Sequence, residues 1–73
     1  MTETLSGRVA ANVRAEIARR GLRQPAIAEA CGLSQTGLSK RLNGHVPWGV
    51  NELAKAADAL GVPVAVLLEQ VQS

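Results

Sequence analysis

Three polar residues near the middle of the chain, Gln35, Thr36 and Lys40, have side chains that can read the edges of DNA bases. Glutamine can bond adenine through two atoms, threonine can offer a hydroxyl or touch a thymine methyl group, and lysine commonly seeks guanine O6 and N7. Thr36 and Lys40 are four positions apart, so a helix would place them on one face. The alternative for such a surface is an ordinary solvated polar helix face.

The segment Gln24–Gly44 that carries these residues has the pattern of two short helices joined by a tight turn. Ile27, Ala28 and Cys31 give the first helix an apolar face. Gly32 then ends it, because glycine adopts the left-handed conformation without a Cβ penalty.

The second helix of this motif begins at Ser34, a good N-cap residue, and Leu38 and Leu42 form its core-facing stripe. Its opposite face is polar and carries no acid, which suits contact with base edges and phosphates; it comprises Gln35, Thr36, Ser39, Lys40 and Asn43.

Helical spacing also predicts elements on either side of the motif. A helix from about Ser6 to Arg20 should end at Gly21 and bury apolar residues that recur every four positions. Gly49 caps a further helix, with Glu52 three residues on. The stripe expected to be buried on that helix comprises Val50, Leu53, Ala57 and Leu60.

A last helix, from about 63 to 71, should begin at Pro63 after Gly61 ends the preceding one. Its apolar residues exceed what one narrow stripe needs, so we expect a homodimer interface there, formed by Val64, Leu67, Leu68 and Val71. Pairing is also expected because 73 residues bury only a modest core.

Composition predicts an all-α chain with a single domain over residues 1–73, since aromatic residues are only 1% and alanine is abundant. Cys31 cannot form an internal disulfide and is interpreted as inert core packing. His45 has no Cys or acid at metal-ligand spacing, so no metal is expected. We also expect no cofactor, no small-molecule ligand, no membrane span and a cytoplasmic location in a bacterial host.

Charge is divided unevenly along the chain. Residues from Arg8 to His45 include seven basic and two acidic side chains, a net +5, whereas the rest holds one basic and four acidic, a net −3. A basic half of this kind is the electrostatic footprint of a nucleic-acid binder, because attraction to phosphate supplies most sequence-independent affinity.

The chain resembles the Cro/cI-type (XRE-like) helix-turn-helix regulators of phages and bacteria over roughly Val9 to Leu68. The matching residues are Gln24, Ile27-Ala28, Gly32-Leu33-Ser34, Leu38-Ser39, Asn43-Gly44 and Leu60-Gly61-Val62. The resemblance implies a compact five-helix lambda-repressor-like fold that binds double-stranded DNA as a homodimer, and a repressor-like role. It also implies phosphate contacts at Gln24, Ser34, Ser39 and Asn43.

Arg23, Arg41 and His45 are expected to contact the DNA backbone on charge alone, although such residues are often only a solvated rim. The stem of Arg41 would lie along the core edge while its guanidinium reaches water or phosphate. The family usually pairs an Arg and a Glu where Ile17 and Leu42 stand here, and packed apolar residues often replace a buried ion pair without loss of stability. Trp48 should pack over the start of the fourth helix, with a dimer or DNA contact as the alternative.

These observations together favour a Cro-like repressor or small phage regulator that binds a pseudo-palindromic operator. Two alternatives stay open: an antitoxin or restriction-modification controller of the same fold, and a helical interaction module that does not bind DNA. An enzyme is not expected, because the sequence offers no paired carboxylates, no Cys/His or Ser/His/Asp constellation and no phosphate-cradling glycine loop.

Overall fold

A computed structural model describes residues 4–69 and shows only helices in that range. Their order is α1 (Leu5–Arg20), α2 (Gln24–Cys31), α3 (Gln35–Leu42), α4 (Val50–Leu60) and α5 (Val64–Leu68). The all-α class and the five helices expected from the sequence are therefore confirmed. None of these helices has the length and apolar character needed to cross a membrane.

The helix ends follow local chemistry. Oγ1 of Thr4 accepts a hydrogen bond from the backbone N–H of Gly7 at 3.0 Å, so α1 begins at Leu5, one residue earlier than expected. Gly21 and Gly32 have φ angles of 65° and 70°, and these left-handed residues end α1 and α2 as predicted. The turn is tight because the N–H of Leu33 donates to the carbonyl of Ala28 at 2.8 Å.

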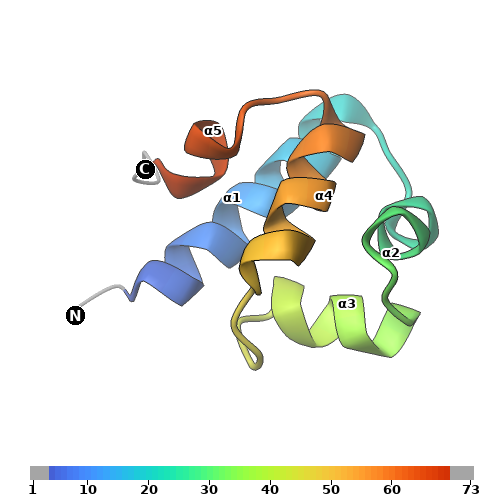
Figure 1. Ribbon diagram of the computed structural model, residues 1–73, viewed down its shortest axis with the longest axis horizontal. Coiled ribbons are helices and arrows are strands. Elements are labelled where there is room, and N and C mark those ends of the chain that lie inside the picture. Colours follow the sequence, from blue (N-terminus) through green and yellow to red (C-terminus); the bar gives the residue numbers. More distant parts are fainter. Residues whose placement is uncertain (1–3, 70–73) are drawn as a thin grey trace.

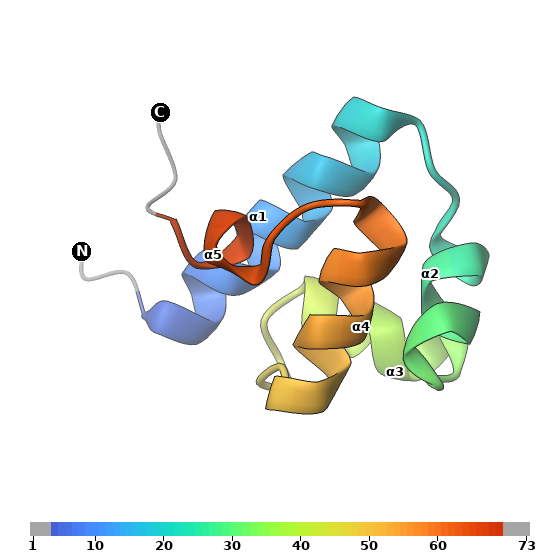
Figure 2. The ribbon, with the colours of Figure 1, turned by 45° about the horizontal axis from the view of Figure 1, so that its top comes forward.

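The helices surround one buried apolar cluster, and α3 lies along the edge of the molecule away from α5 (Figures 1 and 2). Val13 of α1, Leu38 of α3 and Leu67 of α5 are its largest fully buried side chains. Ile17 and Leu42, the apolar replacements for an expected ion pair, are buried in the same cluster. Burial of this stripe fixes α3 so that its opposite face points outward.

The sequence correctly predicted that α4 begins after Gly49, but it was wrong about the burial of Val50. Val50 is 86% exposed, although it was expected in the buried stripe. It is the first residue of the helix, and the residues that face the core are Leu53, Ala56, Ala57 and Leu60. Because these already complete one face, Val50 lies outside it.

The last helix is shorter than expected. It covers only Val64–Leu68, because Glu69 has an extended backbone with ψ of 153°. Residues 70 and 71, which complete the expected range, lie outside the described residues.

Candidate nucleic-acid interface

The polar face of α3 is exposed as a continuous surface. Leu38 and Leu42 are only 1% and 3% exposed, which turns the other side of the helix toward solvent. One open depression brings together seven of the residues singled out in the sequence, from α2, α3 and the loop after α3, and no acid lines it. They are Gln24, Gln35, Thr36, Ser39, Lys40, Asn43 and His45.

Ser34 holds the start of α3 in place beside this depression. Its Oγ accepts a hydrogen bond from the backbone N–H of Gly37 at 3.0 Å, so the N-cap role expected from the sequence is confirmed. Arg23 occupies the corresponding position before α2 but makes no side-chain cap, and it is exposed. Both are outside the group that lines the depression.

The chemistry of this surface suits a polyanion whose edges carry mixed donors and acceptors. Amide and hydroxyl groups of Gln35, Thr36 and Ser39 can donate or accept, while Lys40 only donates and carries a positive charge. Asn43 donates from Nδ2 to Oγ of Ser39 at 3.4 Å, which aligns two of these side chains.

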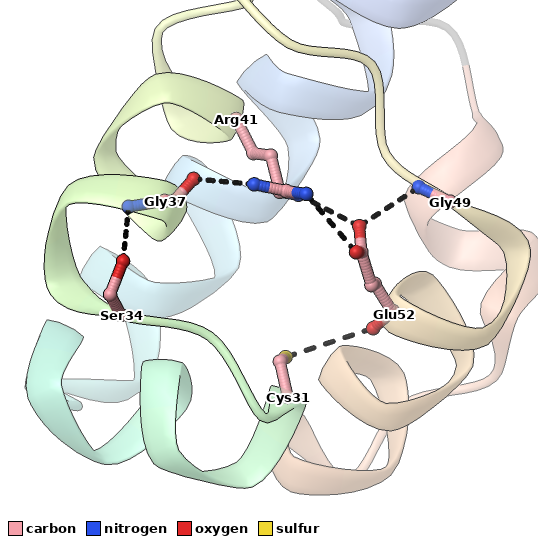
Figure 3. Close-up of polar contacts among 6 residues, drawn as sticks. All are labelled: Cys31, Ser34, Gly37, Arg41, Gly49 and Glu52. Atoms are coloured by element: carbon pink, nitrogen blue, oxygen red, sulfur yellow. Dashed lines mark hydrogen bonds and ion pairs between the residues drawn. The ribbon is translucent and has the colours of Figure 1, made fainter.

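Arg41 differs from the sequence expectation of a guanidinium that reaches water or phosphate. Its Nε and Nη2 donate to the two carboxylate oxygens of Glu52 on α4, at 2.7 and 3.1 Å, and Nη1 donates to the carbonyl of Gly37 at 2.9 Å (Figure 3). The side chain is 17% exposed. The Glu52 carboxylate accepts two parallel hydrogen bonds from the guanidinium, so the arginine is bound within the protein.

The same carboxylate also caps α4. Oε1 of Glu52 accepts a hydrogen bond from the backbone N–H of Gly49 at 3.1 Å, as the spacing predicted. Hydrogen bonding from Arg41, and then from Gly49, holds the pKa of Glu52 below its usual value. Glu52 is therefore charged when it binds Arg41.

Cys31 lies buried behind this ion pair, and its Sγ is 3.7 Å from the carbonyl oxygen of Glu52 (Figure 3). Burial raises the pKa of its thiol, as does the negative charge of Glu52. A thiol that resists ionisation is a poor nucleophile, which fits the core-packing interpretation.

Several polar contacts of α1 were missed by sequence reasoning, and two of its residues, Arg14 and Glu16, bear on the charge of the surface. Nη1 of Arg14 donates to the carbonyl of Leu42, at the C-terminal end of α3, where a cation also complements the helix dipole. Glu16 is only 6% exposed and is paired with Arg19 and Arg20. Part of the basic charge counted in the sequence is thus neutralised within α1.

The dimer interface expected on the last helix needs correction. Leu67 is fully buried against its own chain, so it cannot form a surface with a second copy. Val64 and Leu68 are 37% and 43% exposed and keep the expected outward position. Val71 lies outside the described residues.

Trp48 is partly buried and packs against the core cluster beside α4, as preferred from the sequence. It also lines an apolar hollow with Leu5, Val50 and Leu68. Among residues 4–69, no three side chains of the metal-ligating types His, Cys, Asp and Glu gather in one place.

Comparison with known proteins gives one family and several similar structures. The family model described as a helix-turn-helix domain matches residues 7–70. No curated protein matches the chain.

The solved structures place the fold among transcription regulators. The clp gene regulator ClgR from C. glutamicum has a TM-score of 0.86 and 30% identity, with 92% of this chain and 87% of that chain covered. The hypothetical transcription factor NHTF from Neisseria has a TM-score of 0.83 and 30% identity, with 92% of this chain and 77% of that chain covered. The restriction-modification controller protein C.AhdI from Aeromonas hydrophila has a TM-score of 0.76 and 22% identity, with 82% of this chain and 91% of that chain covered.

Proposed function

Because this chain belongs to the helix-turn-helix domain family, we propose that it is a sequence-specific transcriptional repressor that binds double-stranded DNA in the bacterial cytoplasm. It acts as a homodimer on a pseudo-palindromic operator whose half-sites lie about 10 base pairs apart. Repression follows from occupation of a promoter. Residues 1–73 act as one DNA-binding unit in this proposal.

The observation that carries the proposal is the acid-free, exposed face of α3 with its neighbours on α2 and the following loop. A helix that buries two leucines and presents only polar and basic side chains outward has the form needed to enter a major groove. The two regulators at 30% identity support a role in transcription.

The base contacts are assigned to the outer face of α3. Gln35 and Thr36 lie in its first turn, the part that enters the groove in this motif, and Lys40 follows one turn later. Phosphate contacts are assigned around them, where they fix the register of the protein on DNA; they comprise Gln24, Ser34, Ser39, Asn43, Arg23 and His45. Arg41 is left out because Glu52 binds its guanidinium.

A restriction-modification controller is the second candidate, because C.AhdI shares the fold. Both functions would use the same DNA-binding face, so the structure does not separate them. A methyltransferase gene next to the gene for this chain would favour the controller. An antitoxin of the same fold and a helical interaction module without DNA binding are the other candidates. Of these, only the interaction module predicts no steep salt dependence.

Selection of binding sites from random duplex DNA tests the proposal. The expected result is an enriched sequence with two-fold symmetry, bound with an affinity that falls steeply as salt rises. Enrichment without symmetry would remove the dimer from the proposal. Failure to bind any duplex, or a flat salt response, would remove DNA binding itself.

A further inference from the structure

The only side chain of α3 tied by an ion pair to another helix, among the residues that the structure describes, is Arg41. It bonds Glu52 through both arms of the guanidinium fork, and its third nitrogen bonds the carbonyl of Gly37 within α3. Glu52 is held in turn by the N–H of Gly49. A continuous chain of hydrogen bonds therefore joins the first turn of α4 to the first turn of α3 (Figure 3).

This chain of bonds restrains the orientation of α3, whose outer face is proposed to contact DNA bases. A bidentate arginine–carboxylate pair restrains orientation as well as distance, because two parallel bonds must be kept at once. Arg41 is the immediate neighbour of Lys40 and lies one turn after Gly37. Rotation or tilt of α3 relative to α4, which would shift Lys40 within the protein, would have to break or distort this pair.

The pair has an electrostatic effect as well. A guanidinium recognises phosphate through the same fork that it uses for carboxylate. Arg41 is next in sequence to Lys40, which lines the surface proposed to bind DNA. A free guanidinium there would add attraction that is the same for every DNA sequence. Glu52 holds it in an internal bond instead.

Resting on the proposed function, we propose that Glu52 is a specificity-determining residue of the DNA-binding surface that acts through Arg41. It positions α3 for base contacts and withholds one arginine from sequence-independent phosphate binding. Glu52 is thus a positioning residue that need not touch DNA. Glu52 itself lies on α4, outside the residues that line the depression, and none of those residues is acidic.

The test compares an operator duplex, selected with the wild-type chain, with a scrambled duplex of equal length. Fluorescence anisotropy over a range of salt concentrations gives both affinities for the wild type, Glu52→Gln, and the double variant Arg41→Gln/Glu52→Gln. Glu52→Gln should lower the operator-to-scrambled affinity ratio about tenfold, the size of one lost base contact. Its salt slope on the scrambled duplex should steepen by about 0.9, the value for one added phosphate contact.

The double variant separates the two effects. It should keep the lowered operator-to-scrambled affinity ratio, because the bond that holds α3 to α4 is absent. It should lose the steeper salt slope, because the arginine that Glu52→Gln frees has been removed. Glu29→Gln is the matched control: it removes one exposed acid from the same basic half of the chain. It should leave the ratio unchanged.

Three results would overturn the inference: an unchanged ratio in Glu52→Gln, an equal fall in Glu29→Gln, or a steeper slope that persists in the double variant. If Glu52→Gln fails to give a wild-type circular dichroism spectrum, Arg41→Lys takes its place, since lysine keeps the charge but cannot form the fork; an unchanged ratio there also overturns it. If the wild type binds neither duplex, the proposed function fails instead.

Discussion

Asn12 of α1 donates hydrogen bonds from Nδ2 to the backbone carbonyl of Leu67, at 2.9 Å, and to that of Glu69. Helix α5 has only five residues, and its last carbonyls have no partner within the helix. A helix this short does not persist alone in water. The asparagine therefore fixes the end of α5 on α1 and supports the burial of Leu67.

Replacement of Asn12 by Ala should lower the free energy of unfolding by about 1–3 kcal/mol, because it leaves the partly buried carbonyl of Leu67 without this donor. Urea denaturation followed by circular dichroism measures the loss. Asn51→Ala, which changes an exposed residue of α4, is the matched control and should change stability by less than about 0.5 kcal/mol. Equal losses in both variants would show that the Asn12 contact contributes little.

Ser34 and Thr4 provide a matched pair of helix caps, each accepting a backbone N–H at 3.0 Å. Replacement of either by Ala should cost about 1 kcal/mol of stability. Only Ser34→Ala should also weaken DNA binding, since it borders the proposed DNA-binding face. Thermal unfolding and anisotropy on the operator duplex give the two quantities, and a DNA effect in Thr4→Ala would argue against the placement of that face.

Acid should weaken the fold partly through Glu52. Its pKa in the folded chain is held below the ordinary value of 4.5, mainly by the hydrogen bond from Arg41. The stabilisation is therefore complete above that ordinary value and is lost as the pH falls through the lower folded pKa. As the pH is lowered below 4.5, the urea midpoint of the wild type should fall more than that of Glu52→Gln. If the urea midpoints of the two proteins fell equally with pH, Glu52 would not contribute to the acid sensitivity of the fold.

Lys40→Ala should cost about 1–3 kcal/mol in operator binding and relax the preference at one base position. Gln24→Ala should weaken all sequences similarly, as expected for a phosphate contact. Binding to a panel of single-base operator variants distinguishes the two patterns. Lys55→Ala, an exposed lysine on α4, is the charge-matched control. A uniform loss for Lys40→Ala would place that residue on the phosphate backbone.

Leu68→Glu should shift the proposed homodimer toward monomers, because it places a charge on an apolar patch at the end of α5. Sedimentation equilibrium at micromolar concentration measures the shift. Leu22→Glu is the matched control, since Leu22 is 38% exposed compared with 43% for Leu68 and follows α1 rather than α5. A wild type that remains monomeric without DNA would mean that pairing occurs on the operator or not at all.

Local signals account for what the sequence predicted correctly. Gly21 and Gly32 marked helix ends because their positive φ angles suit glycine, and Ser34 marked the start of α3 because its hydroxyl caps the next turn. The spacing of Leu38 and Leu42 gave the buried side of α3, and so the exposed side with Lys40. Helical periodicity was therefore enough to assign the outer residues to one face.

Contacts between distant parts of the chain could not be predicted in this way. The Arg41–Glu52 pair joins residues 11 positions apart, Arg14 reaches Leu42 across 28, and Asn12 reaches Leu67 across 55. Each of these pairs joins two different helices, so the periodicity within one helix does not relate its members. The one available signal was Arg41 itself, a charged residue whose stem was expected to lie along the core edge.

Gly37 stands within α3, where glycine costs a helix roughly 1 kcal/mol relative to alanine. A Cβ atom there would come 3.2 Å from Oγ of Ser34 and 3.4 Å from Nη1 of Arg41, the two groups that brace the helix. A segment so dependent on its neighbours holds its shape only while the surrounding helices are folded. If the chain binds an operator as proposed, binding and global folding are linked, so an excess of operator duplex should raise the melting temperature of the protein.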